Sequence, residues 1–217
     1  MKFRLLFTLA ALYLAGNLHA QTRLLADPAI SANHIAFSYA GDLWVADRDG
    51  NNPRRLTIDD GVEVAPVFSP DGKTLAFTGQ YDGNYDVYTV SVDGGIAKRL
   101  TWHPGGDMVR DFTPDGKSIL FTSRREAFTN RFDQAFTIGT NGGAATPLDI
   151  PTVNHATYSK DGKYLAYTPL GDRFSMWKNY RGGTISRIWV MKMADNSVVE
   201  IPKPEGGCND TRNCLPF

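Results

Sequence analysis

The feature that most constrains this chain is a short turn motif that recurs along it. Ser69-Pro70-Asp71-Gly72 returns as Thr113-Pro114-Asp115-Gly116 and again as Ser159-Lys160-Asp161-Gly162. In each copy the aspartate can hydrogen-bond to nearby backbone, and the glycine can take the positive φ that a side chain resists. Each copy therefore predicts a tight turn between two strands.

The segment that follows each turn is repeated as well. It begins with lysine and continues as an apolar, strand-like run at residues 73–77, 117–121 and 163–167, and a degenerate copy lies at 31–37. The copies start about 38, 44 and 46 residues apart, the period of four-stranded propeller blades. The repeat therefore predicts an all-β fold: a partial β-propeller of about four four-stranded antiparallel blades in an open, incomplete ring.

A second repeated signature agrees with this reading. Arg55-Leu56-Thr57 and Arg99-Leu100-Thr101 close the first two units at matching places, and Thr146-Pro147-Leu148 is a weaker third copy. In the best-defined unit the strands are expected at Ala65–Ser69, Lys73–Gly79, Tyr85–Val92 and Ile96–Trp102. Alternation in the second of these strands predicts Leu75 and Phe77 on one face and Ala76 and Thr78 on the other.

The blades are expected at about residues 21–62, 63–107, 108–153 and 154–207. In the first unit, strands are expected at Ile35–Tyr39, Asp42–Asp47 and Arg54–Thr57, while Thr22–Ala26 could be a strand that completes a later blade. Residues 208–217 would begin a next blade or form a non-native tail. Because no fifth repeat follows Ile201, the chain is expected to be a fragment of a longer protein or a truncated product.

The first twenty residues have the pattern of a signal peptide. Lys2 and Arg4 precede an apolar run at Leu5–Gly16, and a small-residue cleavage site ends at Ala20. This run is too short to span a bilayer, which needs about 20 apolar residues. The sequence therefore predicts an exported protein, periplasmic in a Gram-negative cell, without stable membrane insertion.

Charge and cysteine usage narrow the function classes further. The formal charge is 23 − 23 = 0 overall and 21 − 23 = −2 without Lys2 and Arg4, and no basic stripe indicates a nucleic-acid partner. Cys208 and Cys214 could pair in an oxidising compartment or remain free thiols. The turn at 47–52 superficially resembles a calcium loop but lacks its glycine and its last acid, so a hairpin turn is favoured and no metal or other cofactor is expected.

Two segments are candidates for ligand or interface contacts, because loops on one face of a repeat fold are its usual binding surface. The charged connection after Ser123 offers Arg124 and Arg125. The insert after Pro169 combines aromatic and basic side chains, namely Trp177, Lys178, Tyr180 and Arg181. A solvated rim for the first segment, and packing against the next blade for the second, are the alternatives.

No catalytic constellation is apparent. The sequence contains no G-x-S-x-G elbow, no C-x-x-C pair, no H-E-x-x-H and no P-loop. His34, His103 and His155 lie at strand ends or in loops, where structural or solvent-facing roles are expected. We therefore expect no catalytic residue in this chain.

The residues nevertheless resemble a known family. The segments 37–44, 77–88 and 112–121, together with the insert at 178–183, are similar to the N-terminal propeller of tricorn-type proteases. The resemblance extends to about Asp210 and does not continue over Thr211–Phe217. The turn repeats alone are less specific, since they also occur in the TolB propeller and in prolyl-oligopeptidase relatives.

This resemblance implies a large serine peptidase with two propellers, a PDZ-like module and a separate catalytic region. The propeller would filter the access of unfolded peptides and support assembly, with peptides or other domains of the parent chain as partners, and it allows a homo-oligomer of the full-length parent. The alternatives are a stand-alone TolB-like protein-binding propeller and the propeller cap of a prolyl-oligopeptidase-type hydrolase. An incomplete ring would leave an apolar face at each end, which predicts aggregation of the isolated chain.

Overall fold

The computed structural model describes residues 25–127, 132–171 and 187–202, and all of the regular secondary structure within these ranges is β-strand. The strands form four antiparallel sheets of four strands each, and each sheet is built from consecutive strands. We call these sheets blades 1 to 4. Blade 1 consists of β1 (Ala26–Ile30), β2 (His34–Tyr39), β3 (Asp42–Asp47) and β4 (Arg54–Arg55), and blade 2 of β5 (Glu63–Phe68), β6 (Thr74–Gly79), β7 (Asp86–Ser91) and β8 (Lys98–Arg99). Blade 3 consists of β9 (Asp107–Phe112), β10 (Ser118–Ser123), β11 (Gln134–Gly139) and β12 (Thr146–Pro147). Blade 4 consists of β13 (His155–Tyr158), β14 (Tyr164–Thr168), β15 (Trp189–Lys192) and β16 (Val198–Glu200).

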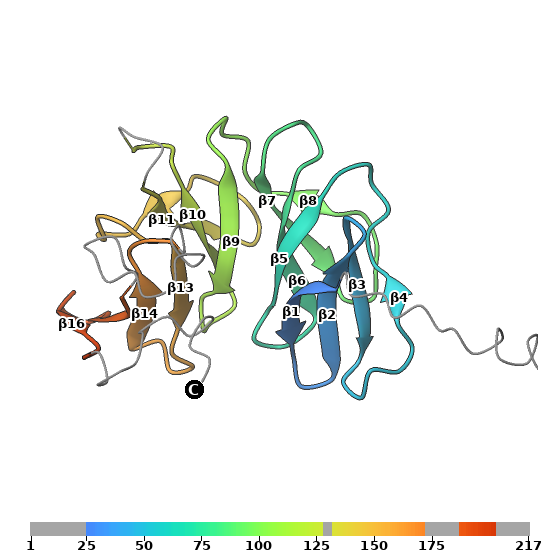
Figure 1. Cartoon of the computed structure of the whole chain (residues 1–217), viewed down its shortest axis with the longest axis horizontal. Helices are drawn as coiled ribbons and strands as arrows, with labels where there is room; N and C mark the ends of the chain where they lie inside the picture. Colours follow the sequence, from blue (N-terminus) through green and yellow to red (C-terminus); the bar gives the residue numbers. More distant parts are fainter. Residues whose placement is uncertain (1–24, 128–131, 172–186, 203–217) are drawn as a thin grey trace, which may run out of the picture.

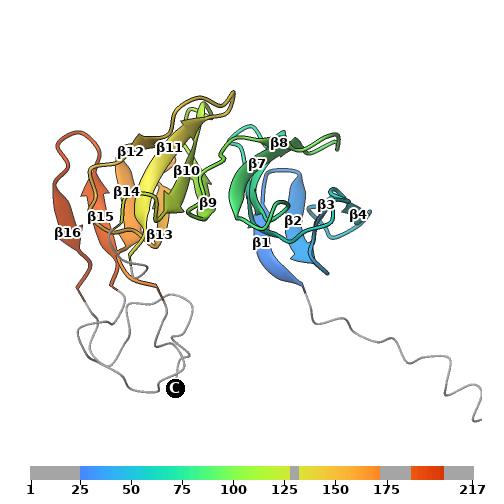
Figure 2. The ribbon, with the colours of Figure 1, turned by 90° about the horizontal axis from the view of Figure 1, so that it is seen from above.

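The blades stand side by side in chain order (Figure 1). Their first strands contact one another, β1 with β5, β5 with β9 and β9 with β13. The last strands of the end blades, β4 and β16, lie at the outside (Figure 2). A shared inner row of first strands with outer strands spread apart is the radial plan of a propeller. The predicted fold class, an all-β partial β-propeller, is confirmed.

The repeated turns have the geometry that the sequence predicts. The Ser69 hydroxyl donates to Asp71 Oδ1 at 2.6 Å, and this oxygen also accepts the backbone N–H two residues further on, at 3.1 Å. The hydroxyl bond and the backbone bond lower the pKa of the Asp71 carboxyl. Gly72 has φ 71°. The same bonds recur in the turns that begin at Thr113 and Ser159.

These turns also touch one another between blades. A Cβ atom placed on Gly116 would lie 3.5 Å from Pro70 Cδ, and one on Gly162 would lie 3.4 Å from Pro114 Cγ. The proline of one turn therefore packs against the glycine of the next. The second residue of the motif thus has a role between blades in addition to setting its own φ.

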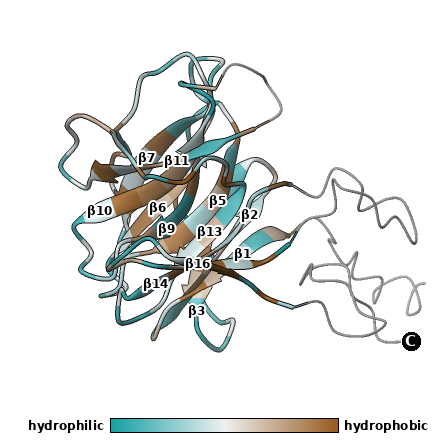
Figure 3. Cartoon of the chain, turned by 90° about the vertical axis from the view of Figure 1, so that its left-hand side faces the viewer, coloured by the Kyte–Doolittle hydropathy of each residue, from teal (hydrophilic) through white to brown (hydrophobic). Residues whose placement is uncertain are grey.

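The two faces of each sheet pack against different blades. Leu75 and Phe77 belong to the apolar cluster shared with blade 1, whereas Ala76 belongs to the cluster shared with blade 3. Thr78 faces blade 3 as well, because its hydroxyl accepts the backbone N–H of Val109 at 2.8 Å. The predicted alternation is confirmed. The core is therefore a series of layers between sheets, and Figure 3 shows hydrophobic residues along the strands, with hydrophilic residues prominent in the turns.

A pair of aromatic side chains on the second and third strands faces the preceding blade. The ring centroids are 5.6 Å apart in Phe77–Tyr88, 5.6 Å in Phe121–Phe136 and 6.1 Å in Tyr167–Trp189. Blade 1 has Phe37 opposite Trp44 in the same register. Among the described residues no sheet covers this aromatic face of blade 1, and Ile30 beside it is 64% exposed.

Two details differ from the sequence-based expectations. Ala26–Ile30 is the first strand of blade 1 and pairs with β2, so the suggestion that Thr22–Ala26 completes a later blade is wrong for Ala26; residues 22–24 lie outside the described part of the chain. The closing strands expected at Arg54–Thr57 and Ile96–Trp102 are only Arg54–Arg55 and Lys98–Arg99, because the chain leaves the sheet after Arg55 and after Arg99. In the described residues, no helix is long and apolar enough to cross a membrane.

Candidate functional site on the loop face

The two ends of the blades carry different kinds of connection. The turn face carries the Ser/Thr-x-Asp-Gly turns and the turns between third and fourth strands. The opposite end, the loop face, carries the loops between second and third strands and the connections between blades. The segments between second and third strands lengthen along the sequence from blade 1 to blade 4, as residues 40–41, 80–85, 124–133 and 169–188, of which 128–131 and 172–186 lie outside the described residues. The loop face is therefore the more variable surface, and repeat folds commonly bind partners on such a face.

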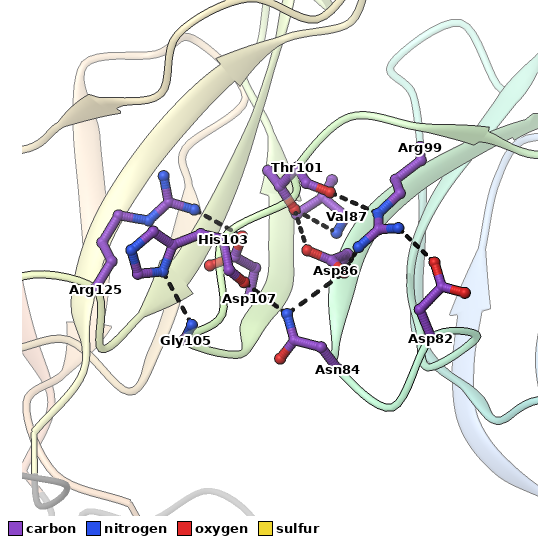
Figure 4. A network of polar contacts seen from close by, with 10 residues as sticks. All are labelled: Asp82, Asn84, Asp86, Val87, Arg99, Thr101, His103, Gly105, Asp107 and Arg125. Carbon is purple, nitrogen blue, oxygen red and sulfur yellow. Dashed lines mark hydrogen bonds and ion pairs between the residues drawn. The ribbon is translucent and has the colours of Figure 1, made fainter.

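In blades 1 and 2 the Arg-Leu-Thr signature ties the outer edge of the blade to this face. Arg99 Nη2 lies 2.6 Å from Asp86 Oδ2 at the start of β7, and Leu100 is buried in the core. The Thr101 hydroxyl accepts the backbone N–H of Val87 at 2.9 Å and lies 3.2 Å from Asp86 Oδ1. Figure 4 shows this network. The signature is thus a latch that closes the fourth strand onto the third.

Blade 1 repeats the same latch. Arg55 Nη2 lies 2.5 Å from Asp42 Oδ1, and the Thr57 hydroxyl accepts the backbone N–H of Leu43 at 2.9 Å. The same hydroxyl donates to Glu63 Oε2 at 2.8 Å. Since Glu63 begins β5 of the next blade, the latch in blade 1 also reaches across to blade 2.

A fully buried acid begins the first strand of blades 2 and 3. Glu63 donates its backbone N–H to Gly41 O at 2.8 Å, and Asp107 donates its own to Tyr85 O at 2.8 Å. Asp107 is held by Arg125, whose Nη2 lies 2.6 Å from Oδ2. Each acid therefore joins its blade to the preceding one through the backbone, and Glu63 does so through its side chain as well, whereas the Asp107 side chain pairs within blade 3.

Burial raises the pKa of two carboxyls at the loop face, those of Glu63 and Asp86. The pKa of Glu63 is raised by burial, and the hydrogen bond from Thr57 opposes this shift only in part. Burial likewise raises the pKa of Asp86 against the opposing effect of Arg99. Burial also raises the pKa of Tyr81, and the negative charge of Glu63 adds to this effect. Burying the charged form of these side chains costs free energy, so we assign Glu63, Asp86 and Tyr81 a structural role.

Blade 3 lacks the latch, because different residues stand at all the polar positions that form it in blade 2. Leu148 donates its backbone N–H to Ala135 O at 2.9 Å, as Leu100 does to Val87 O, which aligns the two units. In this alignment Asp86, Arg99, Thr101 and Asp107 of the preceding unit correspond to Gln134, Pro147, Asp149 and Val153. The weaker copy at 146–148 is visible in the sequence, but the hydrogen bonds are needed to identify which residues replace Asp86, Arg99, Thr101 and Asp107.

Arg124 and Arg125, the first pair of candidate contact residues, have different environments. Arg125 is largely buried, bonds to Asp107, and its guanidinium carbon lies 5.0 Å from the ring centroids of both Phe121 and Phe136. Arg124 is exposed on the loop face and pairs with Asp133 at 2.7 Å. Arg124 therefore presents a guanidinium to solvent, whereas the Arg125 guanidinium is engaged within blade 3. A ligand role for either residue stays a prediction.

The second group of candidates, Trp177, Lys178, Tyr180 and Arg181, lies outside the described residues, as do Cys208 and Cys214. The histidines occupy the places expected of them: His34 and His155 begin β2 and β13, and His103 lies in the connection from β8 to β9. Within the described ranges, no three His, Cys, Asp or Glu side chains are grouped so that they could hold a metal ion.

Comparisons with known proteins place this geometry in a family. The sequence model of the tricorn protease N-terminal beta propeller domain matches residues 22–215. Tricorn protease homolog 1 of Streptomyces coelicolor is 33% identical over 167 residues, which are 77% of this chain and 16% of that protein. The chain therefore spans only a small part of this relative.

Solved structures share the fold. A crystal structure of the tricorn protease superimposes with a TM-score of 0.70 and 24% identity, over 83% of this chain and 18% of that one. TolB from Acinetobacter baumannii superimposes with a TM-score of 0.65 and 23% identity, over 86% of this chain and 45% of that one. Together with the family match over nearly the whole sequence, the radial blades and their repeated turns show that the chain belongs to the family of tricorn protease N-terminal β-propeller domains.

Proposed function

We propose that this chain is the non-catalytic propeller portion of an exported, tricorn-like serine peptidase, in which it filters the access of unfolded peptides and supports assembly. The observation that carries the proposal is the family match over residues 22–215, combined with a loop face where the described loop 80–85 and connection 56–62 expose side chains. The serine and histidine that cut the substrate would lie elsewhere in the peptidase.

The physical support for a filtering role is the contrast between the two ends of the blades. On the turn face, short turns with repeated internal bonds stack on one another. On the loop face, the latch of blade 2 fixes the base of the loop 80–85 at Asp86, and Asp82 in this loop has a side chain that is 71% exposed. A rigid base with variable, exposed loops is suited to selecting which chain segments approach.

A second candidate is a stand-alone, TolB-like protein-binding propeller. The solved TolB structure favours it, because its fold covers 86% of this chain. The tricorn-type proposal remains the stronger, since its sequence match extends over 77% of the chain at 33% identity.

The experiment uses antibodies raised against the full chain to isolate the native protein from its source cells. Mass spectrometry then identifies every polypeptide retained, and the eluate is assayed on an unfolded polypeptide and on a short fluorogenic peptide. We expect hydrolysis that a serine-directed inhibitor abolishes, together with export of the protein with its N-terminus at Gln21. Isolation of the chain with no peptidase activity would contradict the proposal and favour the TolB-like alternative.

A further inference from the structure

The loop face above blades 1 and 2 exposes large apolar side chains that the fold does not require there. Ile58 is 77% exposed and Trp102 is 66% exposed, each two residues after a buried leucine of the latch. The residue at the same place in the third unit, Ile150, is only 4% exposed. The repeat can therefore bury an apolar residue at this place, and exposure of Ile58 and Trp102 is not imposed by strand geometry.

These side chains lie on one continuous surface. The loop 80–85 is hydrogen-bonded to the connection on each side of it: Gln80 N donates to Val62 O at 3.0 Å, and Asn84 Nδ2 donates to His103 O at 2.6 Å. Val62 is itself 40% exposed. The connection that carries Ile58 and Val62, the central loop and the connection that carries Trp102 are thus joined side by side.

Trp102 is held in place by the latch. The guanidinium carbon of Arg99 lies 5.8 Å from the centroid of the Trp102 ring. Arg99 is in turn fixed between Asp82 and Asp86, each at 2.6 Å (Figure 4). A ring positioned by a fixed cation loses little freedom when a partner covers it, which favours binding.

The same surface is acidic. Asp59 and Asp60 are exposed, and the side chain of Asp82 is 71% exposed although it pairs with Arg99. Between Leu56 and Asp86 the sequence contains a single cation, Lys73, which lies in a turn on the opposite face. Carboxylates that outnumber nearby cations attract positive groups and repel negative ones.

We propose that Ile58, Asp59, Asp60, Val62, Asp82 and Trp102 form a docking surface for an extended polypeptide segment that carries lysine or arginine beside apolar side chains. The apolar side chains of such a segment would cover Trp102, Ile58 and Val62, and its cations would pair with the carboxylates. Acidic segments are rejected by the same carboxylates. This inference deepens the proposed function, since it names the class of peptide segment that the loop face would select.

The test measures binding of the full chain to a labelled, unstructured peptide of alternating lysine, leucine and serine, by fluorescence anisotropy. A peptide with glutamate in place of lysine is the matched ligand control. We expect the lysine peptide to bind and the glutamate peptide not to bind. Trp102→Ala should weaken binding about tenfold, as expected of an anchoring aromatic. Asp59→Asn with Asp60→Asn should weaken binding and reduce its dependence on salt.

Matched control variants come from the turn face. Ile96, 98% exposed, and Asp93, also exposed, lie in the turn between β7 and β8. Ile96→Ala and Asp93→Asn should leave the affinity unchanged, and circular dichroism checks that every variant is folded. Equal binding of the two peptides, or equal effects of Trp102→Ala and Ile96→Ala, would overturn the proposal.

Self-association of the chain that Trp102→Ala abolishes would assign the surface to a second copy and would also overturn the proposal. Because binding is measured without a peptidase, its failure is distinguishable from failure of the proposed function, which is read from the activity of the native protein.

Discussion

The hydroxyl of Thr101 provides the sharpest test of the latch. It is the acceptor for the buried backbone N–H of Val87, at 2.9 Å, and it also contacts Asp86 at 3.2 Å. Thr101→Val keeps the shape but removes the hydroxyl. A buried donor without an acceptor costs about 1–3 kcal/mol, and the lost bond to Asp86 adds about 1 kcal/mol. We therefore expect the free energy of unfolding to fall by about 2–4 kcal/mol.

The assay is equilibrium urea denaturation of the full chain, supported by hydrogen exchange of the Val87 amide. Thr101→Ser is the matched control because it keeps the hydroxyl and loses one methyl group, worth about 0.8 kcal/mol. The Val87 amide should exchange faster in Thr101→Val and remain protected in Thr101→Ser. Equal stability of Thr101→Val and wild type, or equal losses in the two variants, would refute the latch.

Three further predictions follow from the junctions between blades. Arg125→Met should lower the free energy of unfolding by about 3–5 kcal/mol because it leaves Asp107 buried and uncompensated, whereas Arg124→Met, which removes an exposed pair with Asp133, should cost about 0–1 kcal/mol; similar losses in chemical denaturation would contradict this assignment. Because the pKa of Glu63 is raised in the folded state, its contribution to stability is full below the unfolded pKa and is lost as pH rises through the folded value. Glu63→Gln should therefore reduce the fall in the free energy of unfolding as pH rises above about 4.5, and an unchanged pH profile would speak against it. The uncovered aromatic face of blade 1 should make the isolated chain self-associate, since roughly 500 Å² of apolar surface is worth about 12 kcal/mol; light scattering that shows a monomer with a sharp, reversible melt would exclude this.

Much of the fold could be predicted from the sequence because the repeat encodes local chemistry. The turn beginning at Ser69 makes its bonds within a few residues, and the alternation of Leu75 with Ala76 requires only a period of two. The short strand Lys98–Arg99 was predicted less well, because its length depends on tertiary contacts and on the positive φ of Gly94 and Gly95.

The latch and the docking surface were harder to infer from the sequence. Thr101 looks like an ordinary strand residue until its bonds to Val87 and Asp86 are known. Arg125 and its neighbour Arg124 are equivalent in the sequence, yet one is buried against Asp107 and the other is exposed. Such differences arise from contacts between residues far apart in the sequence, which no local pattern reports.

The most direct test of the account is a disulfide between neighbouring blades. A Cβ atom on Gly72 would lie 3.4 Å from Ser31 Cβ, close to the separation of about 3.5–4.5 Å that a disulfide requires. In a background with Cys208 and Cys214 changed to serine, Ser31→Cys with Gly72→Cys should oxidise to a cross-link detected by peptide mapping. Ser31→Cys with Gly116→Cys, which skips a blade, should stay reduced. Because Gly72 and Gly116 both have positive φ, circular dichroism of each single glycine variant first checks that it is folded. Failure of the first pair in a folded variant, or cross-linking of the second instead, would contradict a radial array of blades in chain order.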